Sequence, residues 1–129
     1  MMQKTLLDQP YAQIVFDPDR KRLYQTWIGF ATANEFIAAI DVSVRCFQQH
    51  EVETILSDTT DQAVLSKAGS DYAASVMPEL MKNGMKKIAF VLPRSAFVRL
   101  SLQNFKKNAD SELIGNFSSR EEAEAWLDS

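Results

Sequence analysis

Ile88-Ala89-Phe90-Val91-Leu92 is a run of five apolar residues without a polar interruption, and the predicted topology depends on it. A strand with one face in water alternates apolar and polar residues, whereas an unbroken apolar run is typical of a strand covered on both faces in a parallel sheet. We therefore expect a central strand at 88–92, and Pro93 ends it because proline cannot donate to a strand ladder.

The segment before this strand predicts a helix that is interrupted. Apolar residues recur at helical spacing from Tyr72 to Met81, but Pro78 removes a backbone donor within the run. A kink or a break into two short helices follows from this proline. Asn83-Gly84 then provides the stop signal.

The segment after the strand predicts a helix, a strand and a closing helix. Ser95 can cap a helix that extends to about Lys107, and a short strand is expected at 112–117. Ser118 to Glu121 has the spacing of a capping box, and Ala123, Trp126 and Leu127 follow on one helical face.

The amino-terminal half predicts a hairpin, a long helix and a further strand. Strands are expected at 12–17 and 22–28, joined by a turn at Asp17-Pro18-Asp19-Arg20 in which Asp17 bonds the backbone two residues on. A capping box at Thr32 to Glu35 opens a helix over 33–49. A strand at 54–56 is followed by a polar loop at 58–61.

The predicted element order is β-β-α-β-α-β-α-β-α in one α/β domain spanning residues 1–129. Strands separated by helices imply right-handed parallel crossovers, with helices packed on both faces of a mostly parallel, mixed sheet. The hairpin is expected to form an antiparallel edge.

Composition excludes several classes of protein. The 129 residues are 46% hydrophobic and carry a net charge of -3, which argues against nucleic-acid binding because such domains are usually basic. A single cysteine excludes an intramolecular disulfide and favours a reducing compartment. No apolar run is long enough for a signal peptide or for membrane insertion, so we expect a cytoplasmic protein.

The chain resembles the SpoIIAA-like (STAS/SEC14-type) family over nearly its whole length. The likeness rests on the opening hairpin and on core and capping segments, namely Trp27-Ile28-Gly29-Phe30, Ile55-Leu56-Ser57-Asp58-Thr59 and Phe117 to Leu127. The resemblance implies a non-catalytic regulatory module that binds other proteins and, in some members, nucleotides or lipids. It defines a fold more closely than an activity.

The sporulation regulators of this family carry a phosphorylatable serine in an Asp-Ser-Ser-Gly-like context after the third strand. Asp58-Thr59-Thr60-Asp61 stands there in this chain, and no glycine follows. Thr59 or Thr60 could replace the serine, although two flanking carboxylates would repel a phosphate.

Two other polar groups have plain structural explanations. Cys46 and His50 share a helical face as a nucleophile and base could, but core packing and a helix-end imidazole account for them, and no oxyanion donor adjoins them. Asp58 and Asp61 could hold magnesium, yet loop capping explains the pair better because the loop offers few oxygen ligands. We therefore expect no catalytic set, metal or cofactor.

Of the ligand sites considered, an anion site has the clearest physical basis in the sequence. Arg94 and Ser95 follow a parallel strand and open a helix, so a guanidinium, free backbone N–H groups and the helix dipole could converge on an anion. Ser118 and Ser119 join the same rim if the last three strands are neighbours. The alternative is that Ser95 and Ser118 cap helices and Arg94 is solvated.

The proline-interrupted helix suggests a second kind of site. Methionine adapts to varied apolar partners, so this helix could be a lid over an apolar pocket or a dimer face, although core packing explains the pattern as well. The residues concerned are Tyr72, Val76, Met77, Leu80 and Met81.

The sequence thus favours a homodimeric regulatory or protein-interaction module that binds a partner or a small anionic ligand at the carboxyl-end rim of its sheet. The candidate ligand-binding residues of this rim are Asp58, Thr59, Thr60, Asp61, Arg94, Ser95 and Ser118. The alternative is a carrier for a lipid-like or other apolar molecule. An enzyme is the third hypothesis, for which Asp58, Asp61 and Arg94 would have to converge on a cleft.

Overall fold

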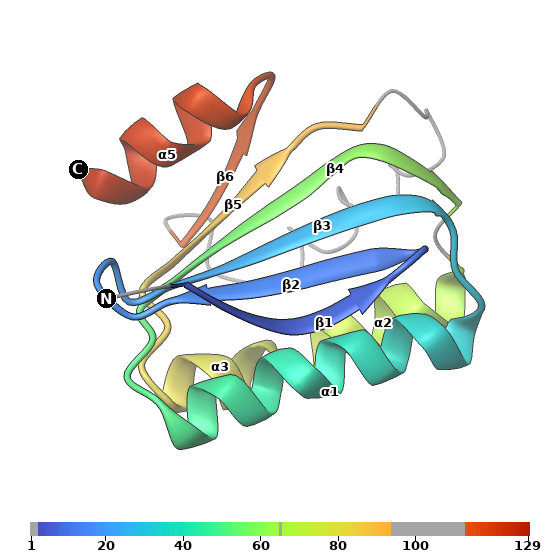
Figure 1. Ribbon diagram of the computed structural model, residues 1–129, viewed down its shortest axis with the longest axis horizontal. Helices are drawn as coiled ribbons and strands as arrows, with labels where there is room; N and C mark the ends of the chain where they lie inside the picture. Colours follow the sequence, from blue (N-terminus) through green and yellow to red (C-terminus); the bar gives the residue numbers. More distant parts are fainter. Residues whose placement is uncertain (1–2, 65, 94–112) are drawn as a thin grey trace.

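A computed structural model describes residues 3–64, 66–93 and 113–129, and within them one six-stranded sheet forms the middle of the molecule (Figure 1). The strands follow one another in space as they do in the chain. They are β1 Lys4–Gln9, β2 Ala12–Asp17, β3 Arg22–Phe30, β4 Thr54–Val64, β5 Lys87–Val91 and β6 Ile114–Phe117. The pairs β1–β2 and β2–β3 are antiparallel and the remaining pairs are parallel, so the expected mixed sheet with an antiparallel hairpin is confirmed.

Helices cover both faces of the sheet, as the sequence predicts. Helices α1 (Ala33–Gln49), α2 (Lys67–Ser75) and α3 (Met77–Lys82) lie together on one face, and α5 (Arg120–Asp128) lies on the other, next to β5 and β6 (Figure 1). The helix expected from Ser95 to Lys107 lies outside the described residues.

The two faces bury separate apolar clusters, and β5 contributes to both. Ile88 and Phe90 belong to the large cluster beneath α1, α2 and α3, whereas Ala89 and Val91 belong to the smaller cluster beneath α5. The unbroken apolar run is therefore covered on both faces, and β5 pairs with β4 on one side and with β6 on the other. It is second from the edge of the described sheet rather than at its middle.

Two local signals form the contacts predicted for them. The Asp17 carboxylate accepts hydrogen bonds from the backbone N–H groups of Asp19 (3.0 Å) and Arg20 (3.3 Å), which closes the β2–β3 turn. Thr32 accepts from the Glu35 N–H at 3.1 Å, and the Glu35 carboxylate accepts from the Thr32 N–H at 2.9 Å. This capping box fixes the start of α1.

Strand β1 was not predicted, and its presence moves the antiparallel edge outward by one strand. Its residues are mostly exposed, and Leu6 and Leu7 pack against the large cluster. The register with β2 shifts between Thr5 and Leu7, so the period-two apolar pattern is lost. The sequence therefore contains no recognisable strand signal there.

The loop predicted at 58–61 is wrong, because these residues lie inside β4. Asp58 pairs with Thr26 and Asp61 with Ile28 in the parallel ladder with β3. Strand β4 thus continues past its apolar part because it pairs with the long strand β3. This pairing outweighs the weak β propensity of residues 58–61. The register shift between these two pairs leaves Thr59 and Thr60 in a bulge.

The break expected at Pro78 is confirmed as two short helices that meet at Val76. Helix α2 begins earlier than the apolar pattern indicated, since the Ser66 hydroxyl caps it by accepting from the Gly69 N–H at 3.0 Å. The predicted capping box at the start of α5 is one residue out of register. Ser119, rather than Ser118, is the cap, and its hydroxyl accepts from the Glu122 N–H at 3.2 Å.

Gly29 allows a left-handed turn near the end of β3, and this position yields a stability prediction. Its φ is +60°, and a Cβ placed there would meet nothing within 4 Å, so backbone strain alone should determine the effect of substitution. We expect Gly29→Val to lower the free energy of unfolding by about 1–2 kcal/mol in urea denaturation. Gly29→Asn should cost clearly less, because asparagine tolerates this region. Equal costs for the two variants would contradict the assigned conformation.

Candidate functional sites

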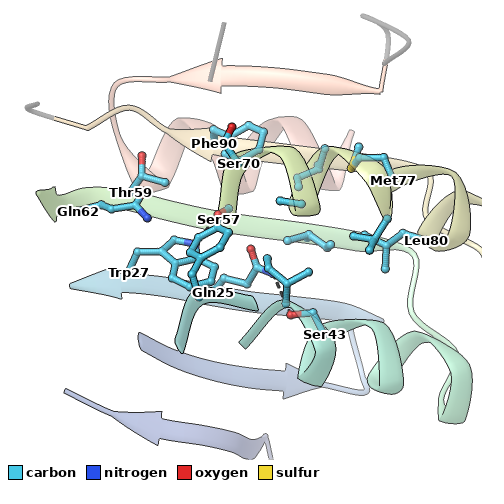
Figure 2. A pocket seen from close by; sticks show the side chains of 16 residues that line it. Gln25, Trp27, Ser43, Ser57, Thr59, Gln62, Ser70, Met77, Leu80 and Phe90 are labelled. Atoms are coloured by element: carbon cyan, nitrogen blue, oxygen red, sulfur yellow. Dashed lines mark hydrogen bonds between the residues drawn. The ribbon is translucent and has the colours of Figure 1, made fainter. Parts of the chain in front are cut away.

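A cavity of about 50 Å³ lies between the sheet and helices α1, α2 and α3 (Figure 2). Most of its described wall is apolar, with Trp27 and Phe36 stacked at 4.6 Å between ring centroids. Six other lining side chains in the described wall carry polar groups, and they come from β3, β4, α1 and α2. They are Gln25, Ser43, Ser57, Thr59, Gln62 and Ser70.

Most of these polar groups are already paired inside the protein. Gln25 donates from its amide to the Ser43 hydroxyl at 2.9 Å, and the Trp27 indole N–H donates to the Ser57 hydroxyl at 2.9 Å. Thr59 donates to the Val91 carbonyl oxygen at 2.6 Å. These bonds tie β3 to α1, β3 to β4 and β4 to β5, so they hold the cavity wall in one arrangement.

Three of the five residues predicted to form an apolar lid line this cavity, namely Val76, Met77 and Leu80. The other two do not. The Tyr72 hydroxyl donates to the Asp41 carboxylate on α1, and this bond together with partial burial raises the pKa of Tyr72. Met81 is 40% exposed on α3.

The carboxyl-end rim predicted to bind an anion is partly built from pairs within the protein. The Asp58 carboxylate accepts from the Thr60 N–H at 3.0 Å and from the Thr60 hydroxyl at 2.6 Å. Its other oxygen pairs with the Arg120 guanidinium at 3.2 Å. A cation and an anion of this rim therefore neutralise each other, and Arg120 is a rim residue that the sequence did not single out.

The remaining rim residues are placed differently from one another. Strands β4, β5 and β6 are parallel neighbours, so Ser118 follows β6 on the same side as Asp58, and its hydroxyl donates to the Glu122 carboxylate at 2.9 Å. Asp61 also interacts within the fold.

Thr59 is 2% exposed, so a kinase would reach it only after local opening. Arg94 and Ser95 lie outside the described residues.

Cys46 packs in the core of the protein, as the sequence favoured. Cys46 is buried, and burial raises the pKa of its thiol to about 11. His50 ends α1, and its ring lies 5.0 Å from the ring of Phe16 between centroids. A nucleophilic thiol needs the opposite environment, one that favours the thiolate.

The raised pKa of Cys46 predicts a slow thiol reaction. Relative to an ordinary value of 9.0, a pKa of about 11 leaves roughly a hundredfold less thiolate at pH 8. We expect 5,5′-dithiobis(2-nitrobenzoic acid) to modify the folded protein at least about a hundred times more slowly than the protein in urea. Equal rates in the two states would show that the Cys46 thiol is accessible to the reagent in the folded protein and would contradict its burial.

Two large apolar side chains on β3 face solvent, which the sequence reading did not anticipate. Ile28 is 44% exposed and Phe30 is 64% exposed. They border an open cleft of about 480 Å³ that is also lined by Gln9, Pro10, Tyr11, Gly29 and Glu35. We call Tyr11, Ile28 and Phe30 the β3-end patch. The sequence does contain a signal for this patch. Side chains alternate between the two faces of a strand, so Ile28 and Phe30 lie on the face opposite to that of buried Trp27.

The cavity's polar residues were missed for a related reason. Gln25 alternates in step with buried Leu23 and Trp27, so it occupies an inward position of β3. Gln62 and Ser70 stand in segments that read as polar surface, and they become buried only when β4 is extended and α2 packs over it.

The described residues contain no group of three or more histidine, cysteine, aspartate or glutamate side chains that could hold a metal ion. None of the helices in these residues combines the length and the apolar character needed to cross a membrane.

Comparisons with known proteins bear on the fold alone. No family model and no curated protein matches the chain. Seven chains of solved structures match it, among them a structure described as the overall structure of SLC26A9, with a TM-score of 0.55 and 12% sequence identity. The match covers 98% of this chain and 24% of that one, so the chain spans about a quarter of the protein it matches. The arrangement of a mixed sheet with helices on both faces is a STAS-like fold.

Proposed function

We propose that this chain is a regulatory module of STAS type that acts by binding another protein through the β3-end patch. The observation that carries the proposal is the exposure of Ile28 and Phe30 beside the open cleft. Apolar side chains clustered on a soluble surface cost free energy unless a partner covers them, so such clusters mark interaction sites. The STAS-like fold supports the same class of function.

The proposal also includes a location, an oligomeric state and an anion site. The module works in the cytoplasm as a homodimer, with the patch open to a different protein. A small anion binds at the carboxyl-end rim when it displaces Asp58 from Arg120, since that guanidinium is half exposed. No catalytic step is part of the proposed function, because binding alone accounts for the patch and the rim.

Variants of the patch test the proposal. We expect Ile28→Ser and Phe30→Ser to abolish capture of a specific protein from native cells while leaving the melting temperature almost unchanged, because both side chains are exposed. Met81→Ser is the matched control, since Met81 is an exposed apolar residue on α3. Identical sets of captured proteins for all variants, or no captured protein for the wild type, would overturn the proposal.

A carrier for a lipid-like molecule is the second candidate function, favoured by the cavity beneath α2 and α3. A lipid chain is far larger than this cavity of about 50 Å³, so its binding would require α3 to move. The junction at Val76 could allow this, because Val76 makes no side-chain cap and Pro78 lacks a backbone donor. A fluorescent fatty acid that shows no saturable binding would exclude this function.

A further inference from the structure

The cavity has two ends of different chemistry. Figure 2 shows Thr59 and Gln62 at one end and Met77 and Leu80 at the other. Gln62 is 5% exposed and Ser70 is 9% exposed, so both side chains are at least nine-tenths buried. They lie in β4 and α2, and both contribute to the cavity wall.

The polar groups of Gln62 and Ser70 differ from the others in the wall. Within the described residues, neither the Gln62 amide nor the Ser70 hydroxyl takes part in a side-chain hydrogen bond, whereas the paired groups of Gln25, Trp27 and Thr59 do. Fully enclosed polar side-chain atoms all have partners in the described part of the chain. The unpaired groups of Gln62 and Ser70 are therefore not fully enclosed by protein atoms, and both residues line the cavity.

The lining residues restrict what could bind to these groups. None of the side chains in the described wall is charged, so none of them offers an ion a countercharge in exchange for its hydration. Ile55, Met77 and Leu80 offer an apolar surface, while the amide and hydroxyl offer both donors and acceptors. This combination is typical of sites that orient an apolar ligand by a few polar groups.

We propose that the cavity is a binding site for a small uncharged molecule, with an apolar body among Met77, Leu80 and Ile55 and a hydroxyl or carbonyl head bonded to Gln62 and Ser70. By the room that one water needs, a volume of about 50 Å³ accommodates a molecule of about three to five non-hydrogen atoms in the observed arrangement. The proposal is independent of the β3-end patch and requires no movement of α3.

Titration with three compounds of one shape tests the charge preference. Isobutanol, isobutylammonium and isobutyrate would be added to the folded protein at pH 7, and the methyl resonances of Met77 and Leu80 would be followed by NMR. We expect saturable shifts with isobutanol alone. Shifts that never saturate, or equal binding of the charged compounds, would overturn the proposal. A cavity occupied by water only, with no response to isobutanol, would also overturn it.

Variants then test the polar end. Gln62→Leu keeps the side-chain size and removes the amide, so we expect the affinity for isobutanol to fall about threefold to tenfold. Gln48→Leu is the matched control, because Gln48 is exposed on α1, and its affinity should equal that of the wild type. If Gln62→Leu does not fold, Ser70→Ala should show the same loss. Wild-type affinity in a folded Gln62→Leu or Ser70→Ala variant would contradict the proposed contacts.

Discussion

Leu56→Ala should lower the free energy of unfolding by about 3–4 kcal/mol. Leu56 is fully buried on β4, in the smaller apolar cluster with Ala123 and Leu127 of α5. Truncation there removes apolar contacts and leaves a cavity, and the surroundings close it only partly because the sheet is rigid. The loss is large for a cluster of this size, so α5 should separate from the sheet more readily in the variant.

Urea denaturation followed by circular dichroism measures this loss. Leu6→Ala makes the same chemical change at a partly buried position on β1, and it should cost no more than about 1.5 kcal/mol. If Leu56→Ala cost as little as Leu6→Ala, the packing of α5 on the sheet would be contradicted.

Glu124→Gln should lower the free energy of unfolding by about 2 kcal/mol, because it leaves a buried guanidinium short of a countercharge. The Arg22 side chain is 3% exposed and pairs with Glu124 and Asp128 of α5, each at 2.7 Å. It also donates to the Thr54 hydroxyl at 3.0 Å. Burial alone would lower the pKa of Arg22, but the hydrogen bond from Arg22 to Asp128 and the charge of Glu124 outweigh it and raise that pKa. The expected loss of unfolding free energy is smaller than for a fully buried ion pair. The carboxylates of Glu124 and Asp128 are partly exposed, so water screens their interaction with Arg22.

A second substitution separates pairing from packing. Combining Glu124→Leu with Arg22→Met removes both charges, and the double variant should be more stable than Glu124→Gln alone. Glu121→Gln, at an exposed position in the first turn of α5, should change the free energy by less than about 0.5 kcal/mol. Thermal and urea unfolding would measure the stability of Glu124→Gln, of the double variant and of Glu121→Gln. A Glu124→Gln variant as stable as Glu121→Gln would show that Arg22 does not depend on α5.

The parts of the fold that the sequence predicts are those encoded by nearby residues. The Asp17 turn and the Thr32 capping box each depend on contacts within a few residues, and both form as expected. The apolar run at 88–92 forms the doubly covered strand that it predicts, but not at the middle of the described sheet. The break at Pro78 has the same local origin, since the missing donor lies within the segment that it interrupts.

The errors arise where distant segments decide the outcome. Strand β4 continues through Asp58 and Asp61 because β3 lies alongside it, and β1 forms because β2 offers an edge. Neither strand carries the apolar alternation from which strands are recognised. The cap of α5 shifted by one residue because Ser118 and Ser119 offer the same chemistry, and backbone geometry chooses between them.

The candidate sites follow the same division. The sequence identified Asp58 and Thr60 as neighbours on a rim, but Arg120 reaches Asp58 from 62 residues away. The lid residues Met77 and Leu80 were predicted from helical spacing, whereas Gln62 joins their cavity only through the extension of β4. Long-range contacts therefore define what each site can bind.

Photocrosslinking in native cells would detect directly whether this module binds another protein through the β3-end patch. A p-benzoylphenylalanine residue would replace Phe30 in one variant and Met81 in the other, since both positions are exposed. We expect a discrete crosslinked protein from position 30 that is absent from position 81. Equal crosslinking from both positions, or none from position 30, would contradict it.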